Sequence, residues 1–366
     1  MSTLKILVPG SVLMMLIGQA SAYDVSDRLT IGGVIAGAMQ CQRLSEKAGA
    51  DNECDSALPL QPELSFRPTD TDEFFVKAGF ANGNGLNGKS PFVLAPWAAD
   101  LHDDVKNING SSRDYLLTAW YQHTIRLATG STLAATAGII DATDYLDENA
   151  YANDEYTQFM NEALVNGPNV FLPSYDAGGA LGWGAGPWSL RGVLMKVNEN
   201  DDGNEFTFYG AQLGYTLQTK LGEGSYRVLV DRTSKDFLGN DGESKHKRAS
   251  LLFSFDQQLD DVVGAFLRFG WQDNGAAVDY DAIWSGGIDI KGNPWHRDDD
   301  NIGLGYAYLD GGNQNVRQSQ VAEGYYRFVI NDNLALSADV QYMIDALQDQ
   351  QNPRGFIYGL RLTAEF

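Results

Sequence analysis

The sequence predicts an all-β protein: a transmembrane antiparallel β-barrel, expected to have 16 strands, with an inward-folded and partly helical loop. Segments that alternate apolar and polar side chains recur along the chain, and short turns alternate with long polar loops. After the first 22 residues no segment has the roughly 18 consecutive apolar residues that a membrane-spanning helix needs. A soluble β-sandwich would also alternate, but its strands are shorter, about 5–6 residues.

The first 22 residues have the features of a secretory signal peptide. Lys5 supplies the positive charge, residues 6–18 are mostly apolar, and Ala20-Ser21-Ala22 forms a small-residue cleavage site. The alternative is a buried N-terminal helix. We therefore expect export, with residues 1–22 as signal peptide and residues 23–366 as the barrel.

Two cysteines, Cys41 and Cys54, lie 13 positions apart in the exported part of the chain. An oxidising compartment favours a disulfide between them, which closes one N-terminal loop and contributes about 2–4 kcal/mol to stability.

The predicted strands are clearest near the C-terminus. In residues 356–366 one face carries Phe356, Tyr358 and Leu360, while the other carries Arg361 and Glu365. This period of two is typical of a strand. The same alternation appears in these segments: 114–127, 205–218, 226–231, 249–255, 264–272, 302–308, 322–330 and 334–342.

Connections of two lengths separate the predicted strands. Short turns are expected on the periplasmic side at 129–131, 186–187, 222–224, 256–261 and 331–333. Longer Gly/Asp/Asn-rich connections are expected outside, at 273–281, 291–300 and 344–354. Two stretches do not alternate: 82–112 is a long loop, and 144–167 has helical character. In a wide barrel, such a loop folded inward over 144–175 would form the constriction.

Charge and motifs exclude several functions. A net charge of −22, from 26 basic and 48 acidic residues, excludes a nucleic-acid binder. Residues 83–90, GNGLNGKS, match a phosphate-binding loop with Gly83, Gly88, Lys89 and Ser90. However, Pro91 follows directly where a helix should begin. We interpret this segment as a flexible loop.

No enzyme motif stands out. The sequence has neither G-x-S-x-G nor H-E-x-x-H, and the acidic clusters lack the spacing of an EF-hand calcium loop. We therefore expect no enzyme, no cofactor and no metal. Two alternatives stay open: a barrel enzyme acting on lipid, and an exported soluble carbohydrate-binding β-protein. The four histidines are scattered at His102, His123, His246 and His296.

Polar and charged residues opposite the apolar runs are the candidate site. Arginine facing lipid at mid-depth costs about 2–4 kcal/mol, so these side chains should face water inside the barrel. Both charge signs together with aromatic rings favour neutral polyhydroxyl solutes; the alternative is that the charges pair across strands and stiffen the wall. The candidate lining residues are Trp120, Gln122, Arg126, Arg191, Arg227, Arg268, Glu323 and Arg327.

Three C-terminal stretches carry a family resemblance. They are RDDDNIGLGYAYLDGG (297–312), QVAEGYYRFVINDNLALSADVQYM (320–343) and GFIYGLRLTAEF (355–366). These residues resemble the end of OprB-type carbohydrate-selective porins of Gram-negative outer membranes, and 138–164 is similar to the family's inward-folded loop. The terminal Phe366 is similar to the signal read by the outer-membrane assembly machinery.

The resemblance implies a 16-stranded outer-membrane barrel and passive diffusion of carbohydrates or other small polar solutes. Outer-membrane lipid, solutes and the assembly machinery are the implied partners. The disulfide and the acidity depart from better-known glucose porins, so the solute, the ion selectivity and the choice between monomer and homotrimer stay open.

Overall fold

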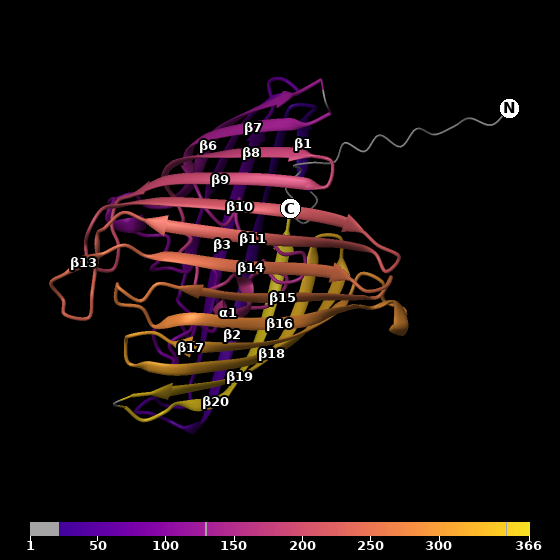
Figure 1. Ribbon diagram of the computed structural model, residues 1–366. Coiled ribbons are helices and arrows are strands. Elements are labelled where there is room, and N and C mark those ends of the chain that lie inside the picture. Colours follow the sequence, from indigo (N-terminus) through magenta and orange to yellow (C-terminus); the bar gives the residue numbers. More distant parts are fainter. Residues whose placement is uncertain (1–21, 129, 349) are drawn as a thin grey trace.

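The computed structural model describes residues 22–128, 130–348 and 350–366, and within them the chain forms a closed antiparallel barrel (Figure 1). Each wall strand pairs with its neighbours in the chain, and β20 pairs with β2 from Val34↔Glu365 to Glu46↔Arg354, which closes the wall. The barrel fold predicted from alternation is confirmed. The signal-peptide interpretation concerns residues 1–22, of which 1–21 lie outside the described part.

Most strands are longer than the sequence patterns suggested, although β6 is shorter than the expected 114–127. Their bounds are β1 Tyr23–Ser26, β2 Leu29–Glu46, β3 Cys54–Phe66, β4 Asp72–Ala78, β5 Phe80–Asn82, β6 Leu116–Arg126, β7 Thr132–Ile140, β8 Asp176–Ala185, β9 Trp188–Val197, β10 Phe206–Gln218, β11 Glu223–Thr233, β12 Phe237–Leu238, β13 Lys245–His246, β14 Ala249–Gln258, β15 Val263–Gln272, β16 Tyr280–Lys291, β17 Asn301–Gly311, β18 Val316–Asn331, β19 Leu334–Leu347 and β20 Arg354–Glu365.

The wall has the 16 strand positions expected from the sequence. β4 and β5 together fill one position, because both pair with β3 and β4 also pairs with β6. β1 pairs only with the start of β2, and β12 and β13 form a separate small hairpin. The remaining strands each hold one position.

Alternation places apolar side chains on the outside of the wall. In β20, Phe356, Tyr358 and Leu360 are exposed, whereas Ile357 and Arg361, which point to the opposite face, are fully buried. An exposed apolar band of this kind is suited to contact with lipid. None of the described helices is long and apolar enough to cross a membrane.

The connections divide into a turn end and a loop end, and one prediction of their placement is wrong. The turn end holds the connection 292–300, since the backbone N–H of Lys291 donates to Val262 in the short β14–β15 turn. Residues 291–300 were expected outside because they are long and polar. Strand parity overrides loop length: β16 begins at the loop end and must finish at the other. The hairpin that contains β13 projects at the opposite end from the β10–β11 turn (Figure 1).

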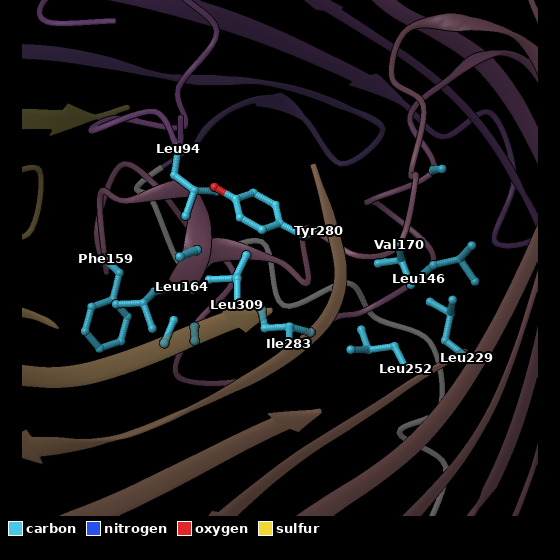
Figure 2. Close-up of a cluster of buried hydrophobic side chains, with 14 of the residues drawn as sticks. Leu94, Leu146, Phe159, Leu164, Val170, Leu229, Leu252, Tyr280, Ile283 and Leu309 are labelled. Carbon is cyan, nitrogen blue, oxygen red and sulfur yellow. The ribbon is translucent and has the colours of Figure 1, made fainter. Parts of the chain in front are cut away.

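Two connections from the loop end fold into the barrel, 83–115 and 141–175. Their buried side chains meet inward-facing residues of the wall, and Figure 2 shows Leu94, Phe159 and Leu164 gathered near Ile283 and Leu309. The inward-folded loop expected over 144–175 is therefore present. The other inward-folded connection, 83–115, has no sequence pattern that would have predicted its path into the barrel.

Both segments are loops, as expected, but the second is less helical and the first is more tightly packed than the sequence suggested. Only Glu162–Val165 (α1) is α-helical in the stretch predicted to be helical, with the Asn161 side chain accepting from the N–H of Ala163. Contacts with the wall hold the rest as irregular turns. In the glycine-rich stretch 83–90, expected to be a flexible loop, Leu86 is fully buried and Asn87 bonds the carbonyl of Trp97 at 2.7 Å. This stretch is packed rather than free.

Candidate functional site

The candidate site is the lumen, narrowed by the connections 83–115 and 141–175. Two groups of inward-facing charged side chains border it. One group lies on β15–β20, which we call the anchoring wall; the other lies on β4–β11, which we call the paired wall. The two groups differ in what their charged atoms contact.

Arg268 of β15 is completely buried beneath the 141–175 connection. Its Nε donates to Oδ1 of Asp147 at 2.9 Å, and its terminal nitrogens donate to the carbonyls of Ala152, Leu164 and Val165 at 2.5–3.2 Å. One guanidinium thus holds three separated points of the loop. A planar group with five donors is suited to this role.

Glu323 of β18 holds the next part of the same loop. Its two carboxylate oxygens accept the backbone N–H groups of Met160 at 2.5 Å and Asn161 at 3.0 Å, and the side chain is only 3% exposed. The Asn161 amide then donates to Gln341 of β19 at 2.9 Å. The loop is therefore fixed to the wall immediately before α1.

Arg361 of β20 is the third anchor. It donates to the carbonyls of Glu155 at 2.6 Å and Gln158 at 2.8 Å, and Thr363 on the same face donates to the carbonyl of Tyr156 at 2.9 Å. Buried donors and acceptors cost free energy unless they are satisfied. These contacts satisfy loop carbonyls that no strand could pair.

Two predicted lining residues are therefore placed differently from the expectation. Arg268 and Glu323 do point inward, as alternation requires, but the loop covers both, and neither side chain reaches lumen water in this structure. Strand parity identifies the face of a residue and does not reveal what packs on that face. Arg361, whose inward parity was also clear, has the same covered position.

On the paired wall, Arg191 and Arg227 keep partial exposure and contact carboxylates. Arg191 of β9 pairs with Glu148 and donates to the carbonyl of Tyr145 at 3.1 Å. Arg227 of β11 lies 2.5 Å from Asp256 of β14. The side chains of Arg191 and Arg227 are 17% and 15% exposed.

The four other predicted lining residues differ in how far they are exposed. Gln122 is half-buried and donates to Thr136 at 2.9 Å, and Arg126 is exposed near the turn end. Trp120, also predicted to line the lumen, is instead buried and stacks on Phe75, with ring centroids 5.0 Å apart. Among the candidates on β15–β20, Arg327 is partly exposed at the turn end and pairs with Glu365 at 3.3 Å.

An acidic cluster that the sequence analysis missed lies beside β3 and β4. Lys77 pairs with Glu63 at 3.3 Å, and Asp100 accepts from Gln61 and from the Tyr175 hydroxyl, both at 2.6 Å. Alternation with the exposed Phe74 and Val76 would have placed Lys77 inside. No local pattern predicts that Asp100, in the 83–115 connection, reaches it.

Burial raises the pKa values of two carboxyls in the inward-folded connections, Asp100 and Asp144. The pKa of Asp100 rises to about 7 because the carboxyl loses hydration and has Asp104 and Asp141 nearby. Loss of hydration also raises the pKa of Asp144 to about 7, with nearby Lys77 opposing the shift. The charge of the constriction thus changes near neutral pH.

Other features lie outside the constriction. Cys41 and Cys54 form the expected disulfide, between facing positions of β2 and β3. In the part of the chain that the structure describes, no three or more His, Cys, Asp or Glu side chains gather as a metal site.

Comparison with known proteins places this barrel in a family. The model of the carbohydrate-selective porin OprB family matches residues 73–366. An uncharacterized protein of Aquifex aeolicus is 30% identical over 297 residues, covering 80% of this chain and 84% of that protein.

Solved structures share the fold at low sequence identity. The high-pH structure of Pseudomonas putida OprB is 13% identical with a TM-score of 0.74, covering 93% of this chain and 94% of that one. The structure of Pseudomonas aeruginosa OccK11 is 10% identical with a TM-score of 0.51, covering 92% and 96%. With the family match and the closed barrel, these likenesses lead to one conclusion: the chain belongs to the OprB family of carbohydrate-selective porins of the outer membrane.

Proposed function

We propose that this outer-membrane porin passes neutral polyhydroxyl solutes, above all sugars, along the paired wall. Gln122, Arg126, Arg191 and Arg227 would contact the solute. The carbohydrate preference named for the family supports the solute class. The porin family and the barrel fold favour a channel rather than an enzyme, and passive diffusion through a channel needs no reacting group.

The observation that carries the proposal is the pairing of partly exposed cations with carboxylates. Arg191 with Glu148, Arg227 with Asp256 and Lys77 with Glu63 each combine opposite charges in one patch. Such patches offer donors and acceptors to hydroxyl groups, but little net attraction to an ion. A neutral sugar can replace its hydrogen bonds to water by hydrogen bonds to these donors and acceptors. An ion loses hydration and gains little in return, because the opposite charges of each pair nearly cancel.

Liposome swelling with solutes of one size and three charges tests this proposal. We expect glucose to enter proteoliposomes several-fold faster than gluconate or glucosamine at pH 6, where Asp100 and Asp144, whose pKa values are raised to about 7, are mostly protonated. Entry of either charged solute as fast as glucose would contradict the proposal.

A charge variant shows whether the pairs carry the preference. Arg191→Gln/Arg227→Gln leaves Glu148 and Asp256 uncompensated, so entry should rise for glucosamine and fall for gluconate. Lys220→Gln, in the exposed 219–222 turn outside the lumen, is the control and should change neither rate. Equal changes in both variants would remove the ion pairs as the cause.

A further inference from the structure

A basic pocket lies at the loop end of the barrel, away from the lumen anchors. Its volume is about 330 Å³, and it forms where β11 ends, beneath the connection that carries β12 and β13 and beside the connection after β15. It is lined by Arg232, Thr233, Ser234, Lys235, His246, Lys247, Asp273 and Gly275.

The pocket concentrates unpaired positive charge in a strongly acidic chain. Three lining cations, Arg232, Lys235 and Lys247, face one lining carboxylate, Asp273. Within residues 22–128, 130–348 and 350–366, none of the three cations forms an ion pair or a side-chain hydrogen bond. In the lumen, by contrast, Arg191 and Arg227 are both paired. The pocket therefore offers unused donors to an anion.

The remaining polar groups of the pocket are already engaged. Asp273 accepts the backbone N–H of Gly275 at 2.9 Å, and His246 lies 2.9 Å from the Ser244 hydroxyl. On the lumen side of the same strands, Arg248 donates to Gln272 at 2.9 Å and stacks on Phe171. The free cations consequently face away from the solute path.

The level of the pocket relative to the membrane indicates its ligand. Arg232 is on the same outer face of β11 as the exposed Val230, two positions further along the strand. It lies directly opposite the exposed Tyr209 of β10. On the same outer face, Trp271 and Trp284 contact each other edge to face at the loop ends of β15 and β16. Aromatic side chains concentrate at the boundary between hydrocarbon and headgroups. Arg232 thus lies at headgroup level.

We propose that this pocket binds the phosphate of an anionic lipid headgroup in the leaflet around the loop end. The Arg232 guanidinium would bind phosphate oxygens in a bidentate manner, and Lys235 and Lys247 would add point charges. Lipid phosphates are always present at headgroup level, so a positively charged pocket at this level is suited to bind them. The inference depends on the membrane orientation of the barrel and is independent of the solute that crosses the lumen.

A binding measurement on the full barrel in neutral detergent tests this site. Native mass spectrometry counts bound lipid A, a bisphosphorylated glycolipid, against the same glycolipid after removal of both phosphates. The test variant is Arg232→Gln/Lys247→Gln, with Lys235→Gln alone as a milder second variant. The matched control is Arg43→Gln/Arg317→Gln, which removes the same charge from exposed positions at the loop end outside the pocket.

We expect the unaltered protein to bind the phosphorylated lipid at least tenfold more tightly than the dephosphorylated one. The double variant should lose about tenfold or more in affinity, as expected from loss of a charged hydrogen bond. Lys235→Gln should lose less, and the control should keep full affinity.

Three results would overturn the proposal. Equal binding of the two lipid forms would show that the phosphate is not recognised. Equal weakening in the double variant and in the control would show a general charge effect of the loop end. Displacement of lipid A by inorganic phosphate at millimolar concentration would indicate a site for free anions instead of a headgroup.

Discussion

The anchoring wall and the paired wall use inward-facing charges in opposite ways. On β15–β20, Arg268, Glu323 and Arg361 are at most 3% exposed and bond the 141–175 connection. On β4–β11, Arg191 and Arg227 stay partly exposed and are paired with carboxylates. The same residue types on the same inner face therefore shape the channel on one side and, in our proposal, serve its solutes on the other.

The largest effect should follow removal of the Arg268 guanidinium. Arg268→Met leaves Asp147 buried without its cation, a change that costs about 3–5 kcal/mol. We expect detachment of the 141–175 connection and a several-fold larger single-channel conductance, with faster hydrogen exchange in that connection. Arg28→Met, at an exposed position between β1 and β2 and not among the proposed solute contacts, is the matched control.

A second substitution separates loss of the anchor from general damage. Arg268→Met/Asp147→Asn removes the unpaired charge while keeping a side-chain oxygen for the N–H of Gly167. Asparagine also tolerates the positive φ of 58° at this position. Conductance should return only part of the way to that of the unaltered channel, because the loop carbonyls still lack the donors of Arg268. Unchanged conductance in Arg268→Met would show that Arg268 does not hold the constriction.

Glu323 should show a graded effect. Glu323→Ala loses both charged hydrogen bonds to the Met160 and Asn161 amides, worth about 1.5–3 kcal/mol each, whereas Glu323→Gln keeps one acceptor oxygen. Increased current noise should follow the order Ala, Gln, unaltered. Asp332→Asn in the exposed β18–β19 turn is the control. Equal noise in all four channels would contradict the anchoring role.

A smaller effect is expected from pH. The pKa values of Asp100 and Asp144 are raised to about 7, so both carboxyls are mostly charged at pH 8 and mostly neutral at pH 5. Reversal potentials in a salt gradient should show cation preference at pH 8 that declines through pH 7. In Asp100→Asn/Asp144→Asn this decline should be largely absent. A full decline in that variant would assign it to other groups.

These same shifts affect folding with a defined sign. A carboxyl whose folded pKa lies above its unfolded value of about 3.9 binds more protons in the folded state between the two values. Stability from Asp100 and Asp144 is therefore present below about pH 4 and lost as pH rises through 7. The Asn variant should flatten this part of the stability profile.

The smallest effect on the channel should come from the disulfide. Cys41 and Cys54 join β2 and β3 near the loop end, outside the anchoring contacts. Cys41→Ser/Cys54→Ser should lower the free energy of unfolding by about 2–4 kcal/mol. Single-channel conductance should remain unchanged. An altered conductance would show that the disulfide affects the shape of the lumen.

The sequence predicts the wall better than what fills it. Alternation in 356–366 and 334–342 identifies strands and their inner faces, because every second side chain must meet lipid or the interior. The course of 83–115 and the burial of Arg268 depend on contacts between residues more than 100 positions apart, such as Arg268 with Asp147. No local pattern records such contacts. Parity also outweighs composition, as the placement of 291–300 shows.

Thiol accessibility tests most directly whether solutes follow the paired wall. Both native cysteines are joined, so Gln122→Cys on the paired wall, or Ser337→Cys on the anchoring wall, introduces a single free thiol. We predict that a water-soluble, bulky thiol reagent lowers the current through Gln122→Cys and that sugar in the bath slows the reaction. Ser337→Cys, at a position only 1% exposed, should not react. Fast block at Ser337→Cys with none at Gln122→Cys would place the path on the other side and contradict the account.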